Sequence, residues 1–108
     1  MKRNPKLEIV DAILGKVNAA IDTMGGAIYS DSKKVFLDFV PNITHDDHIA
    51  TLKELKKAGA IKDFEDRNDS YLMSVSWVLE FPRLQATASA WYVEAYGATV
   101  SEIVTRPV

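Results

Sequence analysis

Two histidines and two aspartates stand together at positions 45–48, in the order His-Asp-Asp-His. Imidazole and carboxylate groups are ligands that divalent metal ions take in proteins. A zinc site normally draws three ligands from the protein, and no third ligand is identifiable elsewhere in this sequence. The competing interpretation is the solvated start of a helix, capped by Thr44 with Asp47 at the capping-box spacing. We favour that interpretation, and we assign no metal ion to His45 and His48 and no cofactor to the chain.

A second charged stretch covers residues 62–69, with the sequence Lys-Asp-Phe-Glu-Asp-Arg-Asn-Asp, and is predicted to form the end of a β-hairpin. Four carboxylates and two cations surround one aromatic residue there. Charge at the end of a hairpin commonly keeps the sheet edge soluble. The same charge could dock on a basic partner surface, with the aromatic ring as an anchor. The candidate partner-binding residues are Asp63, Phe64, Glu65, Asp66, Arg67 and Asp69.

Three lysines, Lys53, Lys56 and Lys57, lie on the polar side of the helix predicted before this hairpin. A helix followed by a hairpin has the order of a winged-helix recognition helix and its wing, so these lysines could contact phosphates. Against this alternative, the hairpin is more acidic than basic, and a later helix and strand are left over. The net charge of −2 also lacks the basic surplus of a general nucleic-acid binder. We expect no nucleic-acid partner.

Several aromatic residues could line a pocket or stack on bases: Tyr71, Trp77, Trp91, Tyr92 and Tyr96. Such a stripe is more often part of a core. Because Trp91 and Tyr92 are adjacent on one helix, one of them is expected to point outward, which hints at a protein interface. A pocket between sheet and helices near Trp77 and Trp91 stays open as the site of a cofactor-independent enzyme or small-ligand module. No glycine-flanked serine elbow occurs, and we assign no catalytic residue.

The composition is that of an ordinary folded domain. The chain has 108 residues, of which 47% are hydrophobic and 26% charged, and we expect one domain over residues 1–108. It has no cysteine, which excludes disulfides, thiolate metal sites and cysteine nucleophiles and fits a reducing compartment. No run approaches the ~18 apolar residues of a membrane span, and the N-terminus lacks a signal-peptide core. We expect a cytoplasmic protein with no membrane contact.

Hydrophobic periodicity predicts the elements. An amphipathic helix over 5–24 starts at Asn4-Pro5 and carries one apolar stripe. A short strand could follow at 27–30. The order then continues with a strand at 34–40, the helix capped by Thr44 and ended by Gly59, a strand at 61–66, a strand at 70–81, a helix at 83–96 and a strand at 98–105.

This order predicts an α+β fold: a ferredoxin-like βαββαβ antiparallel sheet over about residues 34–105, with the N-terminal helix added. In the strand at 70–81, large apolar residues alternate with smaller ones: Tyr71, Met73, Val75, Trp77, Leu79 and Phe81 share one face. The strand at 34–40 is apolar on both faces except for Asp38. We therefore predict that it is an interior strand with both faces covered, the second face by the N-terminal helix or by another subunit.

The absence of a catalytic constellation beside a good core predicts a small non-catalytic protein–protein interaction module. We expect it to be a regulator or inhibitor of a larger complex, with another protein as its partner and a homodimer as one possible form. The alternatives are a nucleic-acid-binding protein, winged-helix-like or sheet-mediated, and a cofactor-independent enzyme or small-ligand domain.

Overall fold

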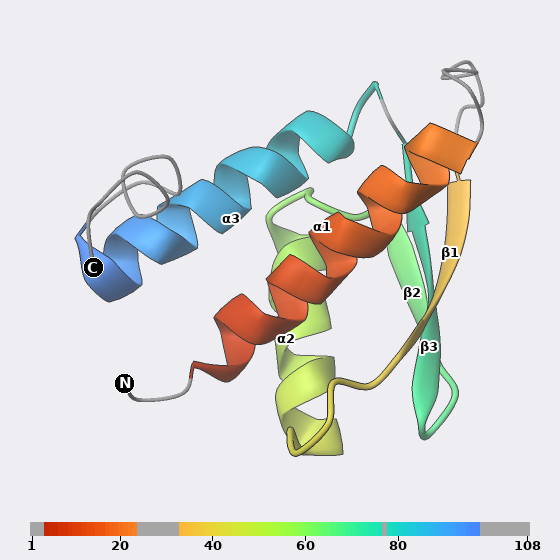
Figure 1. Cartoon of the computed structure of the whole chain (residues 1–108), viewed down its shortest axis with the longest axis horizontal. Coiled ribbons are helices and arrows are strands. Elements are labelled where there is room, and N and C mark those ends of the chain that lie inside the picture. Colours follow the sequence, from red (N-terminus) through yellow and green to blue (C-terminus); the bar gives the residue numbers. More distant parts are fainter. Residues whose placement is uncertain (1–3, 24–32, 77, 98–108) are drawn as a thin grey trace.

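Three helices and three strands follow one another in a computed structural model that describes residues 4–23, 33–76 and 78–97 (Figure 1). In chain order they are α1 (Pro5–Thr23), β1 (Lys33–Asp38), α2 (His45–Lys57), β2 (Asp63–Asp66), β3 (Ser70–Val75) and α3 (Phe81–Tyr96). The predicted α+β class is confirmed. The strands predicted at 27–30 and 98–105 lie outside the described residues.

The described sheet is antiparallel, and its strand order is β1-β3-β2. Because β1 and β2 both run antiparallel to β3, they are parallel to each other and are joined through α2. In the register, Val35 and Phe64 flank Met73, and the next row on the same face holds Leu37, Tyr71 and Asp66. Among the described strands β1 is at the edge of the sheet, so the predicted interior position is not found there.

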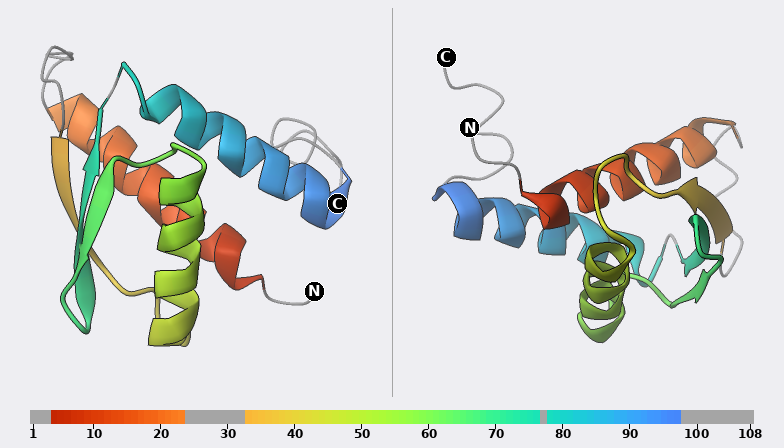
Figure 2. Two further views of the ribbon diagram at one scale, coloured as in Figure 1. Left: turned by 180° about the vertical axis from the view of Figure 1, so that it is seen from behind. Right: turned by 90° about the horizontal axis from the view of Figure 1, so that it is seen from below.

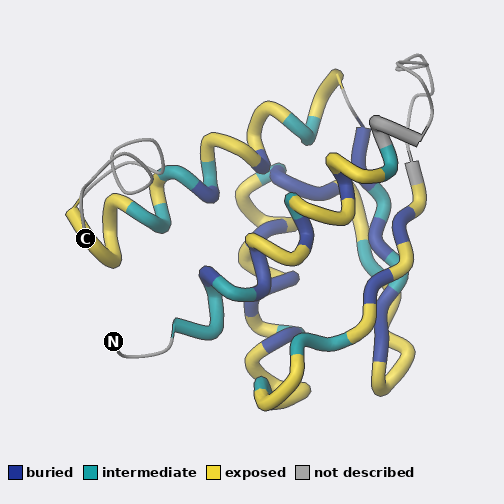
Figure 3. The backbone as a smooth tube through the Cα atoms, viewed as in Figure 1, coloured by how far each residue is buried: buried dark blue, intermediate teal, exposed yellow. Residues whose placement is uncertain are grey.

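All three helices lie on one side of the sheet (Figure 2). Helix α1 packs on β1 and on α2, α2 packs on β2, and α3 packs on α1. The core fills the space between these layers, as the buried segments in Figure 3 show. None of the described helices combines the length and the apolar character needed to cross a membrane.

Helix α1 begins where the sequence predicts, because Asn4 caps it. The side-chain oxygen of Asn4 accepts a hydrogen bond from the backbone N–H of Leu7 at 3.4 Å, and its carbonyl accepts one from Glu8 at 3.1 Å. Leu7, Val10, Ile13 and Val17 of the predicted stripe are buried, but Ile9 outside that stripe is buried too. The reason is that α1 lies between α3 and the layer formed by α2 and β1, so it buries more than one face.

The strand predicted at 70–81 extends past the end of β3, and this part of the prediction is wrong. Ser76 ends the strand, because its hydroxyl accepts the backbone N–H of Leu79 at 3.2 Å while its own N–H donates to Glu80 Oε1 at 2.8 Å. The backbone N–H of Phe81 also reaches the carbonyl of Ser76 at 2.9 Å, and α3 begins. A serine that bonds nearby backbone groups competes with the sheet ladder. Leu79 is consequently exposed rather than part of the core.

The second face of the sheet is covered by none of the described helices, so the prediction that the N-terminal helix covers it is wrong, while coverage by another subunit stays a prediction. Val35 and Leu37 of β1 are buried against the helices, whereas Lys34, Phe36 and Asp38 point the other way. The side chain of Phe36 is 51% exposed. Helix α1 packs on the same face as α2 and leaves this outer face open.

Candidate functional site

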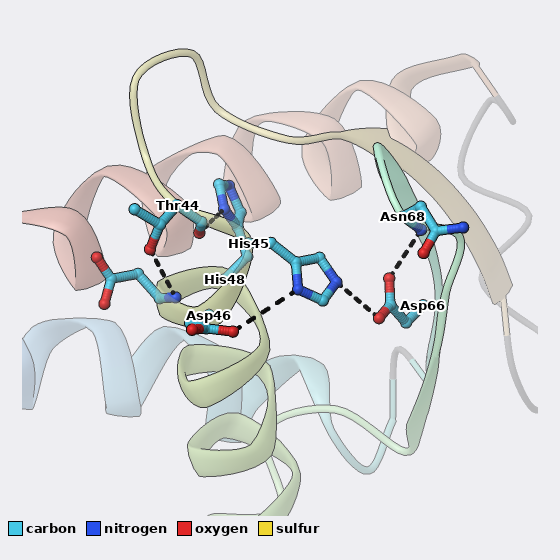
Figure 4. Close-up of polar contacts among 7 residues, drawn as sticks. Thr44, His45, Asp46, His48, Asp66 and Asn68 are labelled. Carbon is cyan, nitrogen blue, oxygen red and sulfur yellow. Dashed lines mark hydrogen bonds and ion pairs between the residues drawn. The ribbon is translucent and has the colours of Figure 1, made fainter.

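The two histidines of the 45–48 turn have separate environments (Figure 4). His48 is fully buried, with Nδ1 2.9 Å from the carbonyl oxygen of Thr44 and Nε2 2.9 Å from the backbone nitrogen of Val40. Because a carbonyl only accepts and an amide only donates, Nδ1 donates to Thr44 and Nε2 accepts from Val40. Phe39 stacks on it, with ring centroids 4.3 Å apart. His48 therefore joins the end of β1 to the start of α2, and the predicted solvated position is wrong for this residue.

His45 instead lies at the surface and ties α2 to the hairpin. Its Nε2 donates to Asp66 Oδ2 at 2.7 Å, while Asp66 Oδ1 accepts the backbone N–H of Asn68 at 2.9 Å (Figure 4). The hydrogen bond from Asn68 and then the contact with His45 hold the pKa of Asp66 below its ordinary value. In the part of the chain that the structure describes, no three His, Cys, Asp or Glu side chains gather as a metal site. The two histidines of the His-Asp-Asp-His sequence therefore make different structural contacts, His48 with backbone groups and His45 with Asp66.

Several charged side chains of the hairpin, Asp63 and Glu65 among them, form ion pairs within the chain. Asp63 Oδ1 accepts from Lys56 Nζ at 3.0 Å and from the backbone N–H of Phe64 at 2.9 Å, and these bonds lower the pKa of Asp63. Glu65 Oε1 lies 3.0 Å from Arg67 Nε. Exposed ion pairs contribute at most about 1 kcal/mol to stability, so each of these charges can exchange its partner at low cost.

The structure separates the predicted partner-binding residues into two groups. Phe64 is half-buried and packs against the core, so it is not a free anchor, and Asp66 is held by His45. Asp69 lies in the turn, where Oδ1 accepts from the hydroxyl of Ser70 at 3.2 Å. Asp63 and Glu65 lie on β2, on the sheet face that points away from the helices. Arg67 comes directly after β2 and contacts Glu65. Of the predicted phosphate-binding lysines, Lys56 is paired with Asp63, and Lys53 and Lys57 are exposed on α2.

A hollow beside Trp91 lies between α1 and α3, and not between the sheet and the helices as the ligand-pocket alternative expects. Lys6 Nζ lies 4.2 Å from the centroid of the Trp91 ring, in a cation–π contact. Trp91 and Tyr92 are both half-buried, and the hydroxyl of Tyr92 donates to Asp11, so neither ring is fully turned outward. Trp77 lies outside the described residues.

The outer face of the sheet has apolar residues in the middle of β1 and β3, with charged residues around them. Phe36 on β1 and Leu72 on β3 are direct cross-strand neighbours in its middle. A hollow beside them is lined by Lys34, Asp63, Phe64, Glu65, Leu72 and Ser74. We call this surface the sheet-face patch and define it as Lys34, Phe36, Asp38, Asp63, Glu65, Arg67, Leu72 and Ser74.

Sequence reasoning missed this patch because it took every apolar residue of the first strand as core. One signal could have found it. Phe36 shares its face of the strand with the charged Lys34 and Asp38, and a strand with one solvated face alternates in this way. Phe36 is thus an aromatic residue on a polar face, and such a position needs an explanation other than the core.

No protein-family model, curated protein or solved structure matches the chain. The geometry of its own residues is therefore the basis of the functional argument.

Proposed function

We propose that this protein is a non-catalytic binding module whose contact surface for a protein partner is the sheet-face patch. The observation that carries the proposal is Phe36, half-exposed in the middle row of a sheet face that no described helix covers. An apolar centre with an aromatic residue and a charged rim is the usual anatomy of a protein interface. A protein that binds in this way without chemistry of its own would act as a regulator or inhibitor of its partner.

The rim charges favour a protein over a nucleic acid. An exposed aromatic ring on a sheet can stack on a base, but the groove around it must then be basic enough to follow a phosphate backbone. Here Asp38, Asp63 and Glu65 outnumber Lys34 and Arg67 around the ring. A phosphate chain laid across this face would meet carboxylates on both edges and be repelled.

The polar clusters support binding rather than catalysis, because their bonds are already used in the fold. His48 has both ring nitrogens bonded to backbone groups, and His45 is bonded to Asp66. We include two finer expectations in the proposal. Residues 98–105 would add a fourth strand beside β1 and complete a ferredoxin-like sheet, which leaves the sheet-face patch open, and the cysteine-free chain would work in the cytoplasm.

The test is site-specific photo-crosslinking in cells that make the protein. A benzoylphenylalanine replaces Phe36 in one variant and Val93 in a matched control, because Val93 is 44% exposed but lies on α3, on the helical side. We expect a discrete protein adduct from position 36 and none from position 93. No adduct at position 36, or the same adduct from both positions, would contradict the proposal.

A further inference from the structure

We infer that the sheet-face patch binds a second copy of this chain, sheet against sheet, about a two-fold axis that runs parallel to β3 in the interface. The inference rests on the proposed function, because it names the partner of the same surface. It follows from the order of charges across the sheet.

The register arranges the outer face in three rows. The first row holds Lys34, Ser74 and Asp63, and the second holds Phe36, Leu72 and Glu65. In the third row, Asp38 pairs with Ser70, and the backbone N–H of Arg67 donates to the carbonyl of Ser70 at 2.9 Å. The contact of Arg67 with Glu65 places it on the same side. The β1 edge therefore has a cation, an aromatic ring and an anion, while the β2 edge has two anions followed by a cation.

These two edges are complementary when the face meets itself. A rotation about an axis parallel to β3 keeps each row in place and brings the β1 edge of one copy onto the β2 edge of the other. Lys34 then faces Asp63 of the second copy, and Asp38 faces Arg67 of the second copy. An axis perpendicular to the strands would also pair opposite charges, Lys34 with Asp38 and Asp63 with Arg67, but it would set Glu65 against Glu65 of the second copy, which are like charges. The axis parallel to β3 sets Glu65 beside Phe36 instead, so the middle row of the face favours that arrangement.

The apolar residues fit the same arrangement. Leu72 lies on β3, the central one of the described strands, through which the axis passes, so it meets Leu72 of the second copy near the axis. Phe36 of one copy lies against the β2 side of the other copy. The hollow of that other copy is on this side, between Leu72 and the side chains of β2. Sheets that pack face to face are about 10 Å apart, which leaves room for one layer of interdigitated side chains from each.

The size of the face sets the strength of the contact. Three strands of six residues or fewer span about 14 by 20 Å at the usual strand spacing and rise. This is roughly 300 Å² per copy, well below the roughly 800 Å² per partner of a standard stable interface. The pairing is therefore a concentration-dependent equilibrium, which leaves the face free for exchange when the protein is dilute.

The experiment is sedimentation equilibrium of the full chain from roughly 1 μM to 1 mM. The mass should rise with concentration from 12.0 kDa towards twice that value. Phe36→Asp should remove the rise, and Lys34→Glu and Asp63→Lys should each weaken association at least about tenfold. Lys53→Glu, which changes an exposed cation on α2, is the matched control and should leave association unchanged.

Mixing the two charge variants is the decisive step. A pair of one Lys34→Glu chain and one Asp63→Lys chain contains the contact between positions 34 and 63 twice. In one contact the introduced carboxylate meets the introduced amine, and in the other Lys34 meets Asp63 as in the wild type. An equimolar mixture of Lys34→Glu and Asp63→Lys should therefore recover the wild-type association, although each variant alone does not. Circular dichroism checks that each variant is folded.

Each result separates this inference from the proposed function. A chain that is monomeric at every concentration overturns the inference, as does a dimer that survives Phe36→Asp or a mixture that stays monomeric. In the crosslinking test, an adduct at position 36 with twice the mass of the chain supports both statements. An adduct with a different protein supports the proposed function and overturns the inference, and a nuclease-sensitive adduct overturns both.

Discussion

Replacing His48 should destabilise the fold much more than replacing His45, although the two residues are three positions apart. His48 is buried, and its ring bonds both the carbonyl of Thr44 and the backbone N–H of Val40. These bonds hold the segment between β1 and α2. His45 is exposed and contacts the accessible carboxylates of Asp66, at 2.7 Å, and Asp46, at 3.9 Å.

The magnitude follows from the bonds. His48→Leu keeps an apolar side chain of similar size but loses two hydrogen bonds, each contributing about 0.5–1.5 kcal/mol net. It also leaves the N–H of Val40 without its partner, and an unsatisfied buried donor costs about 1–3 kcal/mol. We expect a total loss of about 2–6 kcal/mol in the free energy of unfolding. His45→Leu removes an exposed pair and should cost at most about 1 kcal/mol.

Urea denaturation followed by circular dichroism measures both changes, provided that the slope with urea stays constant. Two further variants separate the two bonds of the ring. His48→Asn places an amide near the position of Nδ1, and His48→Gln places one near the position of Nε2, so each should recover part of the lost stability. A His48→Leu variant that is no less stable than His45→Leu would refute the structural role assigned to this ring.

Three further predictions concern other polar side chains. The buried hydroxyl of Tyr71 has no hydrogen-bond partner among the described residues, so Tyr71→Phe should raise the free energy of unfolding by about 1 kcal/mol; a decrease would contradict this. Burial and the bond to Asp11 raise the pKa of Tyr92 from 10.0 to about 12, so its protonated form contributes stability below pH 10 that is lost as the pH rises towards 12. Alkaline denaturation of Tyr92→Phe should lack that part of the loss, and an unchanged profile would count against it. The lowered pKa of Asp66 contributes stability above pH 3.8 that is lost as the pH falls further, so Asp66→Asn should flatten the acid limb; a limb as steep as in the wild type would be inconsistent with the contact.

Helix ends could be predicted from sequence because local chemistry decides them. The hydroxyl of Thr44 accepts the backbone N–H of Asp47 at 3.1 Å, as the capping pattern predicts. Gly97 ends α3 with a φ of 70°, and Gly59 follows α2 with a φ of 75°, in the left-handed region that favours glycine. Each of these signals involves residues within one turn of the helix end, so no tertiary information is needed.

Strand ends and faces could not be predicted in the same way, because they depend on partners distant in the sequence. The alternation after Ser76 continues the pattern of a strand, yet side-chain bonds of Ser76 and Glu80 turn the chain there. The apolar Phe36 has the composition of a core residue, and only the position of α1 on the other side of the sheet leaves it exposed. The burial of His48 likewise depends on Val40 and Phe39, which belong to the segment after β1.

The central claim is that the sheet-face patch is a protein-binding surface, and crosslinking from position 36 tests it most directly. The decisive comparison is the yield of adduct in the wild-type background and with Leu72→Asp, which changes the cross-strand neighbour on the same face. The account predicts a discrete adduct that is lost with Leu72→Asp while the variant stays folded. An adduct that is insensitive to Leu72→Asp, or no adduct at all, would contradict the claim.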